Sequence, residues 1–215
     1  MTKLFVFDLG NVILPFEHRQ IGRKLCEKSK KNGELTPDAI FDFMFSRGAG
    51  LINAYETGHM SSLEFFSELR DRFALAITFE EFKDIWNPIF RENPRVIEAI
   101  EYLKSKGYPL FLLSDTNELH FAHIIDRFPI VHAFDEWILS FEVGVKKPGK
   151  RIYDVIFEKA DVEGPEVFYI DDLERNVEAA RSMGIEALLF QDAEDIWRVL
   201  REKGIWKTAD KGLTA

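Results

Sequence analysis

Five short apolar runs alternate with stretches of helical periodicity, and this alternation constrains the fold more than any other feature. The runs are rich in Phe, Val, Leu and Ile and span residues 4–7, 109–113, 137–141, 167–170 and 187–190. Helical periodicity appears between them, at 94–106, 150–160 and 174–183. Buried strands that alternate with helices indicate a parallel sheet covered on both faces. We therefore expect an α/β fold with a Rossmann-like parallel sheet.

The segment between the first two apolar runs does not follow this alternation. It contains no convincing strand, and it offers two capping-box helix starts, Ser61-x-x-Glu64 and Thr78-x-x-Glu81. Its aromatic residues recur at helical spacing, which is typical of helix packing. At about 70 residues it is longer than an ordinary connection, so we expect a small inserted helical cap domain. The expected parts are a catalytic core of residues 1–14 and 91–207, a cap of residues 15–90 and a flexible tail of residues 208–215.

The charge and composition exclude several classes of partner. The formal net charge is −9 and the pI is near 5.2, which argues against nucleic acid and anionic membranes as partners. No apolar run reaches the roughly 18 residues of a membrane span, and the N-terminus lacks the pattern of a secretory signal. Cys26 is the single cysteine, so there is neither an internal disulfide nor a cysteine metal cluster. We expect a cytoplasmic protein, and the sequence leaves its oligomeric state open.

Polar residues follow the apolar runs at the points where strands would end. Because ligands of a parallel sheet bind beyond the carboxyl ends of its strands, these residues are the candidates for a site. They are Asp8 after the first run, Ser114 and Asp115 after the second, Asp171 and Asp172 after the fourth, and Lys146 and Lys147 before a helix. Carboxylates gathered in this way repel one another unless a cation is bound. Oxygen ligands together with a phosphate ester favour Mg²⁺, and a lysine neutralises both a phosphate and a carboxylate.

Four motifs, in this order, resemble those of the haloacid dehalogenase superfamily, in its phosphatase branch with a small helical cap. They are Phe-Asp-Leu-Gly-Asn-Val, Leu-Leu-Ser-Asp-Thr-Asn, Lys-Lys-Pro and Tyr-Ile-Asp-Asp-Leu-Glu-Arg-Asn. The resemblance runs from Leu4 to about Phe190. More narrowly, Asp-Leu-Gly-Asn-Val, Tyr-Glu-Thr-Gly-His-Met-Ser, Thr-Asn-Glu-Leu-His and Lys-Pro-Gly-Lys-Arg-Ile-Tyr resemble bacterial α-D-glucose-1-phosphate phosphatases and the phosphatase-type domain of soluble epoxide hydrolase.

The resemblance implies a role for each motif. Asp8 would be the nucleophile that forms an aspartyl-phosphate, and Lys147 would support it as a catalytic and phosphate-binding residue. Leu9, Gly10, Ser114 and Asp115 would line the phosphate site. Mg²⁺ would be held by Asp8, the backbone oxygen of Gly10 and Asp172, with Asp171 and Asn176 in support. The expected activity is Mg²⁺-dependent hydrolysis of small phosphate monoesters, in particular sugar phosphates such as an anomeric phosphate.

Gly10 departs from the pattern of the superfamily. Most of its phosphatases have a second aspartate there, which protonates the leaving oxygen, and losing a general acid typically costs about 10²–10⁴ in rate. One explanation is a leaving group that needs little acid, such as an anomeric or acyl phosphate. Another is a replacement acid, for which Asp115, Glu17 and His18 are candidates. A third is that catalysis is lost and the protein is a binding or regulatory module.

Two further enzyme classes fit the sequence less well. A haloacid dehalogenase also uses an aspartate nucleophile but needs no metal, so the Asp171-Asp172 pair argues against it. A phosphomutase needs an acid to move the proton, which Gly10 does not supply.

Within the cap, Asn53, Tyr55 and Glu56 lie in the stretch that matches the relatives and are candidates for substrate contacts. Helix packing or a position on the cap surface is the alternative that we favour for each of these three.

Overall fold

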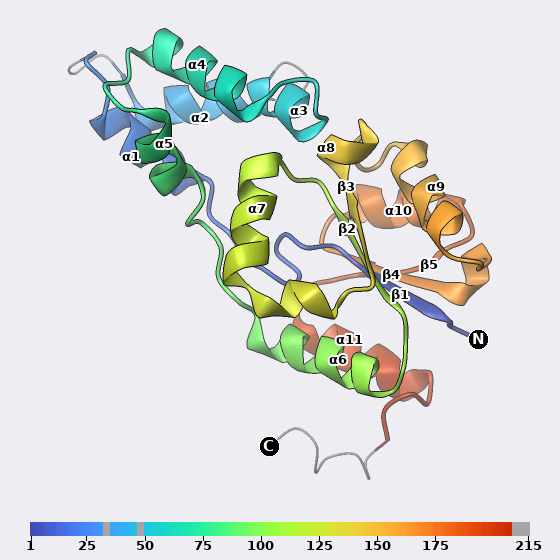
Figure 1. The fold of residues 1–215 in the computed structure, drawn as a ribbon. Helices are drawn as coiled ribbons and strands as arrows, with labels where there is room; N and C mark the ends of the chain where they lie inside the picture. Colours follow the sequence, from blue (N-terminus) through green and yellow to red (C-terminus); the bar gives the residue numbers. More distant parts are fainter. Residues whose placement is uncertain (32–34, 47–49, 208–215) are drawn as a thin grey trace.

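The computed structural model describes residues 1–31, 35–46 and 50–207 and contains a five-stranded parallel sheet (Figure 1). The strands are β1 (Leu4–Phe7), β2 (Leu110–Ser114), β3 (Glu136–Leu139), β4 (Val167–Asp171) and β5 (Glu186–Leu189), in the order β3-β2-β1-β4-β5. Strand β1 is central and pairs with both β2 and β4. The expected α/β fold with a Rossmann-like parallel sheet is confirmed.

Helices cover both faces of the sheet, and the alternation of side chains along β1 explains why. Phe5 and Phe7 point into one apolar cluster, whereas Leu4 and Val6 point into another. The first cluster contains side chains from α6 (Pro94–Ser105), α7 (Glu118–Arg127) and α11 (Ala193–Glu202), and the second from α9 (Lys150–Lys159) and α10 (Glu174–Ser182). The shorter helices are α8 (Ser140–Val143), η1 (Pro129–Ala133) and η2 (Gly164–Glu166).

The prediction of the third strand, residues 137–141, is wrong at its C-terminal end. Strand β3 stops at Leu139, and Ser140 and Phe141 begin α8. The Ser140 hydroxyl donates to the carbonyl of Thr116 and accepts from its N–H, at 3.1 and 3.0 Å. These two bonds tie the chain to the segment after β2, so it leaves the sheet two residues earlier than its apolar sequence predicts. The other strand and helix boundaries differ from the prediction by one residue at most.

In the described residues between β1 and α6 there are five helices, and we call them the helical insert. They are α1 (Arg19–Glu27), α2 (Pro37–Phe45), α3 (Leu51–Glu56), α4 (Ser62–Phe73) and α5 (Phe79–Trp86). Both predicted capping boxes are present, at the starts of α4 and α5. The insert has its own apolar cluster, in which Phe65, Phe82 and Trp86 are fully buried. In Figure 1 its helices lie beyond α7 and α8, so the insert covers one end of the α/β unit.

Two segments join the insert to the sheet, and they run side by side. Phe16 and Phe90 form an antiparallel bridge, and the N–H of Arg91 donates to the carbonyl of Pro15 at 2.9 Å. The chain therefore enters and leaves the insert at one place.

The predicted flexible tail, residues 208–215, lies outside the described residues. Within the described part of the chain, no helix has the length and hydropathy needed to cross a membrane.

Candidate active site

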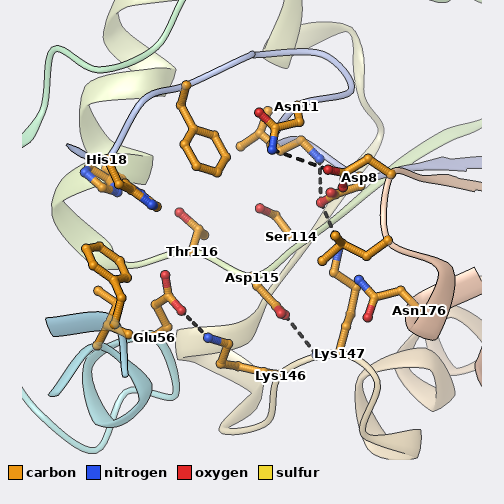
Figure 2. Close-up of a pocket in the computed structure, with 18 of the residues that line it drawn as sticks. Asp8, Asn11, His18, Glu56, Ser114, Asp115, Thr116, Lys146, Lys147 and Asn176 are labelled. Carbon is orange, nitrogen blue, oxygen red and sulfur yellow. Dashed lines mark hydrogen bonds and ion pairs between the residues drawn. The ribbon is translucent and has the colours of Figure 1, made fainter. Parts of the chain in front are cut away.

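A pocket of about 300 Å³ lies where the carboxyl ends of β1, β2 and β4 approach the helical insert. Figure 2 shows Asp8, Asn11 and Asn176 on one side of this pocket and His18 and Glu56 on the other. We call the first side the acidic end and the second the insert end. The sheet brings together most of the site residues that the sequence predicted: Asp8, Leu9, Gly10, Ser114, Asp115, Lys147, Asp172 and Asn176 line the pocket.

Asp8 and Lys147 form a buried ion pair at the acidic end. Asp8 follows β1 directly, and its backbone N–H continues the ladder to Ile170 at 2.8 Å. The Lys147 ammonium donates to Oδ1 of Asp8 at 2.6 Å, to Oδ2 of Asp171 at 2.8 Å and to the Leu113 carbonyl at 3.1 Å. All three N–H bonds of this ammonium are therefore used, which fixes its position beside Asp8.

Asp171 is buried behind this pair and is held by several donors. Nδ2 of Asn176 lies 3.0 Å from one of its oxygens and 3.1 Å from the other, and the N–H of Leu173 donates at 2.8 Å. The hydroxyl of Tyr169 donates as well. Burial works to raise the pKa of Asp171, but the charge of Lys147 and these hydrogen bonds together hold it below its usual range. Asp171 is thus an anion that positions Lys147.

Carboxylate oxygens of Asp8, Asp171 and Asp172 lie within 4.8 Å of one another, so this group can hold a metal ion. Burial raises the pKa of Asp8 to about 8, Lys147 opposes the rise, and the charges of Asp171 and Asp172 add to it. Burial and the charge of Asp171 also raise the pKa of Asp172. Such a cluster is stabilised by a bound cation, and hard carboxylate oxygens suit Mg²⁺.

Asn176 provides a second observation that fits a hydrated Mg²⁺. Its buried Oδ1 has no hydrogen-bond partner among the described residues, although Nδ2 of the same side chain bonds Asp171. Mg²⁺ in proteins keeps several of its waters, and a metal-bound water would satisfy this oxygen. The residues present therefore fit the ion that the sequence predicts.

The predicted phosphate-binding residues differ in what they contact. Ser114 is 2% exposed and lies at the end of β2, between the acidic end and the insert end (Figure 2). The Leu9 N–H donates to Oδ1 of Asp8 at 2.8 Å. Asp115 accepts from the backbone N–H of Lys147 at 2.9 Å, so its carboxylate anchors the loop that carries the lysine. Burial raises the pKa of Asp115, and Lys147 opposes that rise.

A side chain at position 10 would require the Phe16 ring to move. A Cβ atom placed on Gly10 would lie 2.7 Å from Cε1 of the Phe16 ring. Asn11 adopts a left-handed conformation with φ of 56°, which asparagine tolerates better than most residues. The tight turn that follows brings the chain back so that Phe16 lines the pocket beside Gly10. Asn11 also donates to Oδ2 of Asp172 at 3.3 Å.

The insert contributes Glu56, His18 and two aromatic rings to the pocket. Glu56, at the end of α3, forms an ion pair with Lys146 from the core. His18 stacks on Phe45 with ring centroids 4.6 Å apart and lies 4.4 Å from the Phe16 ring. Burial, with a smaller contribution from Lys146, lowers the pKa of His18 to about 4, so His18 is neutral at pH 7.

Three of the predicted candidates do not line the pocket: Asn53 and Tyr55 of the cap, and Glu17, a possible replacement acid. Tyr55 is buried inside the insert, where its hydroxyl contacts Ser62, and Asn53 is exposed on α3. Neither residue is among those that line the pocket. Glu17 is exposed and pairs with Arg23 at 2.7 Å, also outside the pocket lining. The sequence did not single out Asn11, Phe16, Phe45 and Arg175, which line the pocket as well.

Comparison with known proteins places this geometry in a family. Residues 2–184 match the family described as a haloacid dehalogenase-like hydrolase. The chain belongs to this family. A D-ribitol-5-phosphate phosphatase of Bacteroides thetaiotaomicron is 28% identical over 205 residues, which cover 92% of this chain and 96% of that protein. A phosphorylated carbohydrates phosphatase of Thermotoga maritima is 33% identical over 109 residues, about half of each chain.

A solved structure of a family member agrees with the fold. It is a haloacid dehalogenase family enzyme from Bacteroides thetaiotaomicron, in complex with magnesium and inorganic phosphate, with a TM-score of 0.77. It is 23% identical, and the match covers 89% of this chain and 95% of that one. The likeness therefore includes the helical insert as well as the sheet.

Proposed function

We propose that this haloacid dehalogenase-like hydrolase is a Mg²⁺-dependent phosphatase of small sugar phosphates that works through an aspartyl-phosphate on Asp8. The buried Asp8–Lys147 pair at the end of β1, next to Asp171 and Asp172, carries this proposal. Lys147 contacts Asp8 at 2.6 Å and opposes the rise in its pKa, and a bound cation would favour the charged carboxylate further, which is the form that a nucleophile for phosphorus requires. The names of the two relatives support the class of substrate.

In the proposed reaction, Asp8 attacks phosphorus in line while the alcohol leaves toward the insert end. Lys147, together with Ser114 at the end of β2, stabilises the negative charge on the transferring oxygens. Asp8, Asp172 and the backbone oxygen of Gly10 would hold Mg²⁺, with Asp171 and Asn176 in support. When bound, the ion neutralises charge on the phosphoryl group. Water then hydrolyses the aspartyl-phosphate.

Gly10 and Phe16 favour a leaving group that needs little protonation. Position 10 is a glycine, so the acid that most phosphatases of this superfamily have there is absent, and the Phe16 ring occupies the space beside it. An anomeric or acyl phosphate leaves with less help than a simple alkyl phosphate, so we propose an anomeric sugar phosphate as the substrate type. Asp115 is the replacement acid that we favour, since it is half-buried, lines the pocket and has a raised pKa because of burial.

The insert would act as the cap. We propose a core of residues 1–14 and 91–207 and a cap of residues 15–90, joined at the Phe16–Phe90 bridge. Two connections at one place suit a rigid rotation of the cap that admits substrate and then excludes bulk water. A small-molecule phosphate ester is the proposed partner.

The experiment is steady-state release of phosphate from sugar phosphates, acyl phosphates and nucleotides, with and without Mg²⁺. Asp8→Asn is the control, because it keeps the shape of the side chain and removes the nucleophile. We expect turnover that requires Mg²⁺, disappears in Asp8→Asn and is fastest on anomeric or acyl phosphates. Absence of turnover in folded, metal-loaded protein would favour a binding or regulatory module. Release of halide from 2-haloacids without metal would favour a dehalogenase.

A further inference from the structure

The insert end of the pocket holds an ion pair that the proposed chemistry does not use. Glu56 comes from α3 of the insert, and Lys146 comes from the loop between α8 and α9. Figure 2 shows this pair on the side of the pocket opposite Asn11, with Asp115 between Lys146 and Lys147. If the phosphoryl group lies against Asp8 and Lys147 at the acidic end, the group that leaves extends toward Glu56 and Lys146, which line the same pocket.

The position of Glu56 is fixed by packing between the insert and the core. Gly58, two residues after Glu56, has φ of 70° and approaches the core backbone so closely that a Cβ atom there would lie 2.2 Å from the carbonyl oxygen of Phe141. Glu56 itself is 9% exposed, and its ion pair with Lys146 spans the two parts of the molecule. A carboxylate held this firmly provides acceptors at a defined place.

The charges at the insert end leave no cation to receive a second anion. The charge of Lys146 is matched by Glu56, and Lys147 is occupied by Asp8 and Asp171. Asp115 lies near enough to add negative charge, since it contributes to the raised pKa of Glu56, after burial and against the opposing effect of Lys146. The remaining cation in the described lining, Arg175, comes from α10, the helix that also carries Asn176.

The uncharged groups at the insert end suit hydroxyl groups and the flat faces of a sugar. Thr116 offers a hydroxyl, and the neutral ring of His18 offers a donor and an acceptor. Phe16 and Phe45 add two aromatic walls to the same pocket. Hydroxyl groups of a substrate could donate to Glu56 and accept from Lys146 without breaking the charge balance between these two side chains.

We propose that Glu56 and Lys146 form a charge-selective subsite that accepts an uncharged, polyhydroxylated leaving group and rejects one with a second anionic group. The inference rests on the proposed phosphatase function and narrows its substrate class to monophosphates of neutral sugars or polyols. Sugar bisphosphates, phosphorylated sugar acids and nucleoside diphosphates would be excluded, because each places an anion against Glu56 and Asp115.

The test compares substrates that differ by one carboxylate and have the same phosphate ester. One pair is glucose 1-phosphate and glucuronic acid 1-phosphate, and the other is ribitol 5-phosphate and ribonic acid 5-phosphate. The quantity measured is the ratio of kcat/KM for the neutral member to kcat/KM for the acid. We expect the wild-type protein to prefer the neutral member by at least about tenfold, because like charges brought together strongly disfavour the wrong ligand.

The variants separate charge selection from docking of the insert. Glu56→Gln leaves Lys146 unmatched, so the ratio should fall by about tenfold or more, with an absolute gain on the acid substrate. Lys146→Met should move the ratio in the opposite direction. Ser62→Ala is the matched control, because Ser62 donates to Glu118 across the insert and the core at 2.6 Å, and neither residue lines the pocket. This control should leave the ratio unchanged.

A wild-type ratio near one, or an equal loss on both members of a pair in Glu56→Gln, would overturn the inference. The same preference can be measured by calorimetry as the ratio of the dissociation constants of the two members of a pair. This measurement uses an Asp8→Asn background and requires no turnover. If the wild-type protein turns over no phosphate ester but the binding ratio follows the expected pattern, the proposed function fails and the subsite remains. If turnover is normal and neither ratio responds to Glu56→Gln, the subsite alone fails.

Discussion

The ring of Phe16 fills the space into which a side chain at position 10 would extend, with Cε1 only 2.7 Å from the place of a Cβ atom on Gly10. Gly10→Asp alone should therefore displace Phe16 and fail to accelerate turnover of alkyl phosphates. Gly10→Asp combined with Phe16→Ala opens the space, and an acid there should raise kcat for alkyl phosphates by about 10²-fold, the lower range for general acid catalysis.

The measurement for this pair is kcat on an alkyl phosphate beside kcat on p-nitrophenyl phosphate, whose leaving group needs no proton. Phe16→Ala alone is the control for the loss of the aromatic wall. A rate gain in Gly10→Asp as large as in the double variant would show that Phe16 does not restrict this position.

Lys147 should be important for stability as well as for catalysis. Lys147→Met leaves Asp8 and Asp171 buried without their shared cation, which typically costs about 3–5 kcal/mol of unfolding free energy. Denaturant unfolding at pH 7 without metal should show this loss, and saturating Mg²⁺ should recover part of it. Lys150→Met is the control, since Lys150 is exposed and pairs with Asp154 on the surface of α9. Equal stability of the two variants would contradict the account of the buried pair.

Asp172 should control the affinity for Mg²⁺. Asp172→Asn keeps the shape of the side chain but removes a charge from the cluster of Asp8, Asp171 and Asp172. We expect the Mg²⁺ dissociation constant to rise by at least about tenfold, since removing even a partner of a metal ligand has that effect. Calorimetric titration measures it, with the exposed Asp71→Asn on α4 as the control. An unchanged affinity would place the ion elsewhere.

His18 should make stability depend on pH in the acidic range. Burial lowers its pKa from 6.5 to about 4 in the folded protein, so between these values the unfolded chain binds more protons. Stability from His18 is therefore lost as the pH falls from about 6.5 to about 4, by at most about 1.4 kcal/mol per pH unit. His18→Phe keeps a ring for stacking and should have a flatter curve of unfolding free energy against pH. Parallel curves for wild type and His18→Phe would contradict the lowered pKa and neutral state of His18.

The sequence predicted which residues would gather at the acidic end, because their positions follow local rules. Asp8 and Asp171 end apolar strands, and all strands of a parallel sheet place their carboxyl ends at one edge. Once that fold is known, Asp172 and Lys147 are expected near them. The prediction needed only the order of strands and helices along the chain.

The insert end was less predictable, because its contacts join distant parts of the chain. Glu56 and Lys146 are 90 residues apart, and Glu56 was a candidate only through its neighbours in sequence. Phe16 lies beside Gly10 because of the turn at Asn11, whose left-handed conformation the apolar pattern does not encode. The end of β3 was wrong for the same kind of reason, since Ser140 bonds Thr116 from 24 residues away.

The most direct test of the central claim is to look for the phosphoryl group on Asp8. Wild-type protein would be mixed with Mg²⁺ and an excess of glucose 1-phosphate or acetyl phosphate, quenched in acid during turnover and digested for mass spectrometry. The account predicts a peptide with Asp8 that is heavier by one phosphoryl group, and no such peptide from Asp8→Asn. Phosphate release in the wild type without a phosphorylated Asp8 peptide, or equal release by Asp8→Asn, would contradict it.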